Sequence, residues 1–256
     1  MNLVELATRE DQLQVQQTPR EDNKLRLEDR AAHDWYRFVL SFPAHLVRTY
    51  IGRFGLDQKH NVLDPFCGTG TTLVECKKLG IQSYGIEPNP MASFASRTKV
   101  DWEIDPENLI AHATLVAKFA SDKLASEGID DEGGLPLFET RRRTLPTLKT
   151  LPPDALKLLL TNSISPLPLH KTLVLLEALE ENREPTLAAH ERLALSKTLV
   201  NEISNLHFGP EIGVGPAKPD AAVGGGRSGA SRALQTIEPH RARKRQAPVD
   251  IEMEKP

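Results

Sequence analysis

The chain has 256 residues, of which 39% are hydrophobic and 5% aromatic, and its formal net charge is −3. This length allows one large domain or two small ones, and the low aromatic content predicts that part of the chain lies outside a packed core. The charge excludes a uniformly basic nucleic-acid-binding surface, although a local basic patch remains compatible with it.

The cysteine content and the apolar runs narrow the class of protein further. Two cysteines exclude a disulfide framework and a four-cysteine zinc site, so we expect a reducing, cytoplasmic location and no metal. No apolar run reaches the roughly 18–20 residues that a membrane span needs. Residues 1–10 lack a cationic region followed by an apolar stretch, and we therefore expect no secretory signal.

The N-terminal part predicts a flexible arm and then a helix. Residues 1–30 are polar and rich in glutamine, which favours a poorly ordered arm. Aromatic residues become frequent from Asp34 onward, and Trp35 and Tyr36 are expected to belong to a core. After Pro43, apolar residues recur at helical spacing, which predicts a helix that stops near Gly55.

The next segment has the pattern of a βαβ unit. The run NVLDPF has the length of a strand, and CGTGTT follows it as a glycine-containing loop. TLVECKKL then predicts a helix that ends at Gly80, and QSYGIE predicts a second strand that breaks at Pro88. A further helix begins near Met91. This order predicts an α/β domain over residues 31–105.

The remainder of the chain changes character twice. Residues 106–208 predict a helical insertion, with an amphipathic stripe near 109–120 and further helices near 153–162, 169–182 and 185–206. Between them, the loop with Arg141 to Arg143 is expected to be solvated. Residues 209–256 are rich in glycine and arginine and show no sustained period, which predicts a disordered or aberrant tail.

The glycine-containing loop predicts a cofactor site that lacks the usual phosphate-binding residues. Gly68 and Gly70 allow a tight turn and a close approach of a ligand to the backbone. The dinucleotide fingerprint G-x-G-x-x-G would need a small residue where Leu73 stands, and the lysine of a P-loop is missing from the turn. Asp64 precedes the loop and can accept a hydrogen bond from an ammonium group. Glu87 lies at the distance in sequence at which an acid holds ribose hydroxyls. S-adenosylmethionine has a ribose, an ammonium group and no phosphate.

These residues resemble a known enzyme family. DPFCGTGTTLVE and YGIEPNP are similar to motifs I and II of the N4-cytosine/N6-adenine DNA methyltransferases, and FPAHLVRTYI is similar to their motif X. The resemblance implies a partial Rossmann-like fold, which would be the N-terminal part of a seven-stranded sheet. It also implies S-adenosylmethionine as cofactor and DNA as partner, as in restriction-modification systems. It also implies methyl transfer to an amino group of a flipped base. The residues that it assigns to the cofactor are Phe42, Pro43, Asp64, Pro65, Phe66, Cys67, Gly68, Thr69, Gly70, Thr72, Glu87 and Asn89.

The catalytic motif of that family is absent from the sequence. The motif is a tetrapeptide, D/N/S-P-P-Y/F/W, whereas the single Pro-Pro pair here, Pro152-Pro153, lies between Leu151 and Asp154. We therefore assign no catalytic residue. No cysteine follows a proline either, so a cytosine ring-carbon mechanism has no support. With only two clear strands, we expect a truncated methyltransferase, or a subunit whose sheet a second chain completes.

Two other functions stay open at this stage. The first is an RNA methyltransferase that acts on the exocyclic amine of guanosine, whose first motif can also read DPFCGTG. Those enzymes carry a hydrophobic pair where Thr71-Thr72 stands here, and they carry an N-terminal RNA-binding domain. The second is a non-catalytic remnant that binds S-adenosylmethionine. In every case we expect Cys67 to pack as a small residue within the loop.

Overall fold

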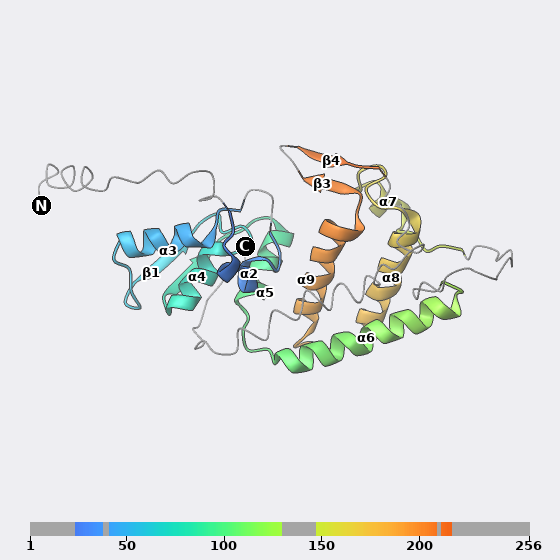
Figure 1. Cartoon of the computed structure of the whole chain (residues 1–256), viewed down its shortest axis with the longest axis horizontal. Helices are drawn as coiled ribbons and strands as arrows, with labels where there is room; N and C mark the ends of the chain where they lie inside the picture. The colour runs from blue at the N-terminus through green and yellow to red at the C-terminus, as the bar shows by residue number, and fades with distance from the viewer. Residues whose placement is uncertain (1–23, 38–40, 130–146, 209–210, 217–256) are drawn as a thin grey trace, which may run out of the picture.

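The computed structural model describes residues 24–37, 41–129, 147–208 and 211–216. Figure 1 shows a part that contains the βαβ unit at one end of the molecule and a helical part at the other. The expectations for the N-terminal arm up to residue 23, the arginine loop at 141–143 and the tail from 217 onward lie outside the described residues.

The N-terminal elements lead into the predicted helix. A 3-10 turn, η1 (Leu27–Asp29), continues into the short helix α2 (Arg30–His33). Helix α3 (Ala44–Arg53) has Pro43 as its N-cap, and Gly55 follows it with a φ of 64°. The start and the end expected from Pro43 and Gly55 are therefore confirmed.

The βαβ unit has the predicted order and limits. Strand β1 (Asn61–Asp64) is followed by α4 (Thr71–Leu79), β2 (Gln82–Gly85) and α5 (Pro90–Val100). The two strands are parallel, and their register pairs Asn61 with Gln82 and Asp64 with Gly85. Gly80 ends α4 in the left-handed conformation, which a residue without a Cβ adopts at no steric cost.

One face of this sheet packs against α4. A Cβ at Gly85 would lie 2.7 Å from Leu73 Cδ1 and 2.8 Å from Cys67 Sγ, so only glycine permits this close approach of strand and helix. Val62 packs on the same side, against a cluster that includes Ile51 and Cys76. The helix therefore covers the face that carries alternate residues of each strand.

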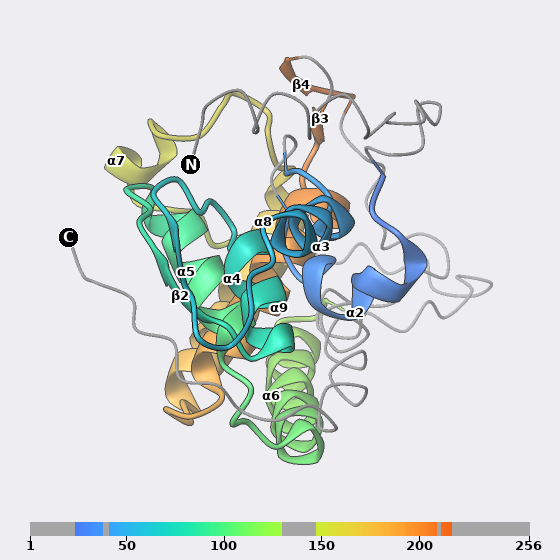
Figure 2. The ribbon, with the colours of Figure 1, turned by 90° about the vertical axis from the view of Figure 1, so that its left-hand side faces the viewer.

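The helical part contains one long helix and two shorter ones. Helix α6 (Pro106–Ser126) packs on α8 (Pro166–Glu181), and α9 (Ala188–Thr198) continues into a π-helical turn, η2 (Leu199–Ile203). Figure 2, turned by 90°, shows α6 and α9 behind and below the βαβ unit. One hydrophobic cluster joins the βαβ unit to the helical part. In it, Trp35 and Tyr36 pack with Ala95 of α5, Leu109 of α6 and Leu193 of α9. The expectation that both aromatic residues belong to a core is confirmed, because they are 2% and 7% exposed.

Two helices of the helical part differ in extent from the expectation. The helix expected at 153–162 is a single turn, α7 (Pro153–Leu156). The leucines after it, Leu158 and Leu160, are 86% and 54% exposed, and Asn162 has a φ of 61°, so neither packing nor backbone extends the helix. Helix α8 begins three residues earlier than expected, at Pro166, which is suited to the first helical position.

A hairpin takes the place of the last expected helical turn and of the first part of the expected tail. Its second strand lies within 209–256, so the expectation of a disordered tail was wrong for residues 212–214. Strands β3 (Leu206–Phe208) and β4 (Ile212–Val214) pair antiparallel in a separate sheet. Asn205 holds the entry to the hairpin, because its amide donates to Asn162 O at 2.9 Å and its backbone N–H donates to Ser163 O at 2.7 Å. The described residues thus form a mixed α/β structure with two small sheets, and a seven-stranded sheet is not confirmed.

Candidate functional site: the glycine loop at the ends of β1 and β2

The loop between β1 and α4 is held in place by hydrogen bonds to the end of β2. The backbone N–H of Cys67 donates to Ile86 O at 3.1 Å. The N–H of Gly68 donates to Glu87 Oε2 at 2.9 Å. Asp64, at the end of β1, accepts from the N–H of Phe66 at 3.1 Å. Both predicted acids therefore lie at the carboxyl ends of the parallel strands, where ligands of open α/β sheets bind.

The two loop glycines have different surroundings. Both adopt positive φ, 53° at Gly68 and 81° at Gly70. A Cβ at Gly68 would meet no atom within 4 Å, whereas a Cβ at Gly70 would lie 2.4 Å from Ser96 Oγ. Gly68 thus borders open space that a ligand can enter, and Gly70 lets the loop pack against α5.

Glu87 fixes the geometry of the loop through both carboxylate oxygens. Besides the bond to Gly68, its Oε1 accepts from the N–H of Asn89 at 2.8 Å. A carboxylate has about four lone-pair positions, so two positions remain for hydroxyl donors. The side chain is partly exposed. Glu87 therefore joins the glycine loop to the end of β2 and keeps acceptor capacity toward a ligand.

Phe42 and Pro43, which the motif X resemblance assigns to the cofactor, directly precede α3. Pro43 is buried as the N-cap of α3, and Phe42 is 46% exposed. Helix α3 packs on α4, the helix that follows the glycine loop, and Ile51 shares a cluster with Cys76 and Ile81. This packing ties the motif X segment to the helix after the loop.

Several other predicted site residues have side chains with structural roles. Cys67 and Thr69 are each 4% exposed, and Cys67 packs in a cluster with Leu73 and Val74. Burial raises the pKa of the Cys67 thiol, which favours its neutral form. Asn89 caps α5, since its side-chain oxygen accepts from the N–H groups of the next helical turn at 3.0 Å.

The remaining residues that were predicted to bind the cofactor are exposed or partly exposed. Pro65 and Phe66 lie at the surface, and Phe66 is 81% exposed. Thr72, in the first turn of α4, is partly exposed. No side chain caps the N-terminus of this helix within the described structure. The first N–H groups of α4 have no partner within the helix itself.

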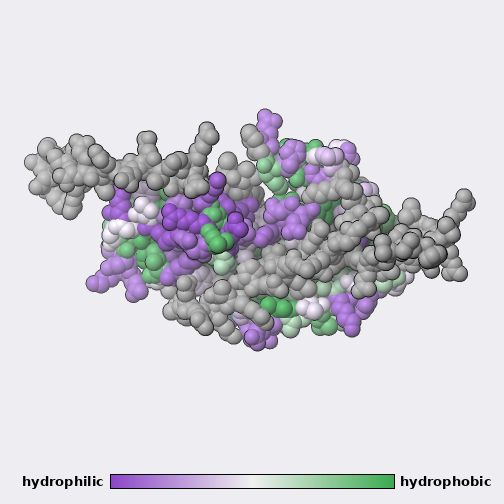
Figure 3. All heavy atoms as spheres, viewed as in Figure 1, coloured by the Kyte–Doolittle hydropathy of each residue, from purple (hydrophilic) through white to green (hydrophobic). Residues whose placement is uncertain are grey.

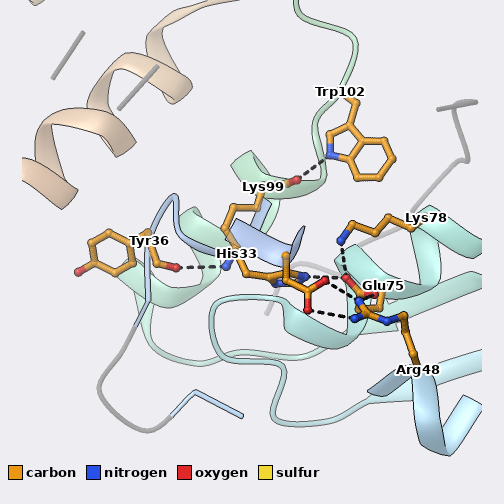
Figure 4. A network of polar contacts seen from close by, with 8 residues as sticks. His33, Tyr36, Arg48, Glu75, Lys78, Lys99 and Trp102 are labelled. Carbon is orange, nitrogen blue, oxygen red and sulfur yellow. Dashed lines mark hydrogen bonds and ion pairs between the residues drawn. The ribbon is translucent and has the colours of Figure 1, made fainter. Parts of the chain in front are cut away.

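A buried ion-pair cluster surrounds Glu75 of α4, and the sequence analysis did not predict it. Glu75 is fully buried, and its carboxylate contacts His33 Nε2 at 2.6 Å, Arg48 Nη1 at 2.6 Å and Lys78 Nζ at 2.7 Å. Arg48 also donates to Asp29 at 2.7 Å. Figure 4 shows the side chains converging on Glu75 from α2, α3 and α4. The cluster thereby fastens the segment before α3 to the helix that follows the glycine loop.

The electrostatics of the cluster favour a charged Glu75 and a neutral His33. Burial by itself raises the pKa of Glu75, but hydrogen bonds from His33, Lys78 and Arg48 outweigh it and lower the pKa to about 2. Burial lowers the pKa of His33 below its usual 6.5. The neutral ring must then carry its proton on Nε2 to donate to the carboxylate. In the part of the chain that the structure describes, the buried Nδ1 of His33 has no hydrogen-bond partner.

The same region holds a second anchor for the N-terminal segment. Lys99 of α5 is 1% exposed and donates to the carbonyl oxygen of Tyr36 at 3.1 Å. Figure 4 shows it beside the Glu75 cluster. A glutamate and a lysine inside otherwise apolar helical faces were the only sequence signals of these contacts, because their partners lie 42 and 63 residues away. Among the described residues, no three histidine, cysteine or acidic side chains are grouped so that they could hold a metal ion.

The parallel strands, the loop and the acid after the second strand form one α/β unit. Residues 9–93, about a third of the chain, match the N6/N4 methyltransferase family model, which is described as DNA methylase. This segment of the chain is similar to that family.

The curated relatives are also methyltransferases. The chain is 39% identical over 71 residues to the type II methyltransferase M.BsoBI of Geobacillus stearothermophilus. These 71 residues are 28% of this chain and 14% of the relative. It is 37% identical over 57 residues to the type II methyltransferase M.AvaI of Nostoc sp. PCC 7120. These 57 residues are 22% of this chain and 12% of the relative. The matches therefore span only about one seventh of these relatives. No solved structure gives a significant match, and no helix in the described ranges is long and apolar enough to cross a membrane.

Proposed function

We propose that this chain is the S-adenosylmethionine-binding part of a DNA methyltransferase that modifies an amino group of adenine or cytosine. The observation that carries the proposal is the position of Glu87. Its carboxylate holds the glycine loop at Gly68, next to open space at the carboxyl ends of two parallel strands. An acid at this point can accept hydrogen bonds from the two hydroxyls of a ribose.

The chemistry of the site supports this cofactor over a nucleotide phosphate. Asp64 and Glu87 place two acids beside the loop, and a phosphate would be repelled by both. An ammonium group is attracted by Asp64 instead. Gly68 then lets the backbone approach the ligand. Phe42 and Pro43, which directly precede α3, are further residues that the motif X resemblance assigns to the cofactor. The family supplies S-adenosylmethionine as the methyl donor.

DNA is the favoured substrate. Both relatives are type II methyltransferases, and the family model is that of DNA methylases, which supports DNA over RNA. We assign the cofactor to residues 31–105, with 106–208 as a helical insertion that packs on them through Trp35 and Tyr36. The base to be methylated would be taken out of the helix before transfer.

Calorimetric titration of the full chain with S-adenosylmethionine tests the proposal. The Glu87→Gln variant should bind about 10- to 100-fold more weakly, because it leaves hydrogen bonds to the ribose worth about 1–3 kcal/mol unmade. Glu103→Gln, at an exposed position beyond α5, is the matched control and should bind as the wild type does. Absence of binding by the wild type at millimolar cofactor would refute the proposal.

A second variant separates loss of the ligand from loss of the loop geometry. Gly68→Ala adds a methyl group where the structure has open space, at a φ of 53° that strains an alanine. The strain should cost about 1–2 kcal/mol of folding free energy, and the free energy of cofactor binding should fall by more than this. Unchanged affinity in both Gly68→Ala and Glu87→Gln would remove the loop from the binding site.

A further inference from the structure

Two buried acids and one arginine, Asp29, Glu75 and Arg48, form a clamp between α3 and α4. Arg48 Nη1 lies 2.6 Å from Glu75 Oε2 and 2.7 Å from Asp29 Oδ1, and Arg48 Nη2 donates to Asp29 Oδ2 at 3.0 Å. On the face shown in Figure 3, hydrophilic residues dominate the surface of the βαβ end. Asp29 and Glu75 are instead 2% and 0% exposed. Replacing a buried ion pair by apolar residues is often neutral for stability, whereas a forked guanidinium holds its acids in one geometry. The clamp therefore fixes where α3 lies on α4.

The clamp lies one helical turn from the start of each helix that it joins. Arg48 is one turn after Ala44, the first residue of α3, and Glu75 is one turn after Thr71, the first residue of α4. One turn rises about 5.4 Å along a helix axis. The first turn of α3 and the glycine loop before α4 are thus both within about one turn of the same ion pair.

The first turn of α3 contains a buried polar side chain without a partner. His45 is 6% exposed, and within the described ranges neither of its ring nitrogens has a hydrogen-bond partner. No side chain caps the N-terminus of α3 in this part of the structure. Side chains on a helix lean toward its N-terminus, so the imidazole lies beside the uncapped N–H groups. This end of a helix attracts negative charge, and the negative group of S-adenosylmethionine is the carboxylate of its amino-acid part.

The glycine loop is held by contacts that do not involve α3. The N–H of Cys67 donates to Ile86 O, and the N–H of Gly68 donates to Glu87. A change in the clamp therefore shifts the first turn of α3 and leaves the loop in place. The adenosine part of the cofactor, assigned to Gly68 and Glu87, and the amino-acid part depend on different contacts.

We propose that Arg48 and Glu75 are positioning residues of the cofactor site, whose ion pair holds the first turn of α3 at a fixed distance from the glycine loop. Neither residue touches the cofactor. With the clamp intact, both parts of S-adenosylmethionine meet preorganised contacts at once. Without it, α3 must be ordered when the cofactor binds, which lowers the affinity. The inference rests on the proposed function and adds to it the residues that preorganise the site.

Calorimetric titration of the full chain with S-adenosylmethionine and with adenosine tests the inference. Arg48→Lys keeps the charge but lacks the planar fork that joins both acids. It should weaken S-adenosylmethionine binding at least about tenfold, because the contacts of α3 are no longer preorganised. Adenosine affinity should stay within about twofold, because the loop is anchored to the end of β2. The backbone amides of residues 44–47 should exchange hydrogen faster than in the wild type, without cofactor present.

Glu191→Gln is the matched control for a purely structural effect. Glu191 is also a buried acid, 4% exposed, and it pairs with His112 at 2.7 Å, but this pair joins α9 to α6. The variant should lose stability and keep the wild-type ratio of the two affinities. Urea unfolding gives the folded fraction of each variant, by which the affinities are corrected. Asp29→Asn, which leaves the contact between Arg48 and Glu75 in place, is a milder second variant with a smaller loss of the same selectivity.

Two results would overturn the inference alone. They are equal losses for the two ligands in the clamp variants, and an equally selective loss in Glu191→Gln. A wild type that binds neither ligand would refute the proposed function and the inference with it. Failure of the positioning role and failure of the proposed function are therefore distinguishable.

Discussion

Replacement of Glu75 by glutamine should strongly destabilise the folded chain. The substitution keeps the shape of the side chain and removes its charge, which leaves Arg48, Lys78 and His33 around a neutral group. The lowering of the Glu75 pKa from 4.5 to about 2 corresponds to about 3 kcal/mol in favour of the charged form, which is the net value after the opposing cost of burial has been subtracted. Loss of one member of a buried ion pair costs about 3–5 kcal/mol in other proteins, which is the same range.

Urea unfolding at pH 7 measures this effect, and Glu177→Gln is the matched control. Glu177 also contacts two lysines, Lys123 and Lys149, but it is 41% exposed. Solvent screens such surface pairs, so the control should lose at most about 1 kcal/mol. Equal losses in the two variants, or a loss below about 1 kcal/mol for Glu75→Gln, would refute the reasoning from burial.

The pH dependence gives an independent measurement on the same cluster. The folded pKa of Glu75 lies below its unfolded value of 4.5, so its contribution is present above pH 4.5 and lost as the pH falls toward 2. The pKa of His33 is lowered from 6.5, so protonation also favours the unfolded chain as the pH falls below 6.5. The wild type should thus lose stability on acidification, and the part lost between pH 4.5 and 2 should be smaller in Glu75→Gln.

Four further outcomes are expected. Gly70→Ala should cost about 1–3 kcal/mol in urea unfolding, because the new methyl group meets Ser96 at a positive φ. Asn89→Ala should cost about 1 kcal/mol through loss of the α5 cap, with cofactor affinity nearly unchanged. Cys67 and Cys76 should resist thiol reagents at pH 8 until urea is added, because both are buried and burial raises the pKa of Cys76 to about 11. The chain alone should transfer no labelled methyl group to unmethylated DNA, since its sequence lacks the tetrapeptide that stacks on the base, and incorporation would contradict this.

Local signals in the sequence determined the βαβ unit and its glycine loop. Pro43 and Gly80 mark a helix start and a helix end through backbone preferences that act within a few residues, and both limits are confirmed. The spacing between Gly68 and Glu87 placed an acid after the second strand, and the two residues are in contact. A parallel βαβ crossover follows from the order of its elements, so the position of Glu87 at the strand end beside the loop was predictable. The hydrogen bond from the N–H of Gly68 to Glu87 was not predicted, because the sequence indicated a ribose as the partner of Glu87.

Tertiary packing decided the features that depend on distant partners. Leu158 and Leu160 fit a helical pattern, but both stay largely exposed, and α7 ends after one turn. Gly70 packs against α5 and Asn89 caps it. Both roles depend on the position of α5, which the sequence motifs do not indicate.

The Glu75 cluster required the most tertiary information. Glu75 and His33 are 42 residues apart, and the cost of burying the carboxylate is offset only when α2, α3 and α4 come together. A sequence reveals conformational preferences of nearby residues, whereas the burial of a charge depends on where the folded chain brings its opposite charges.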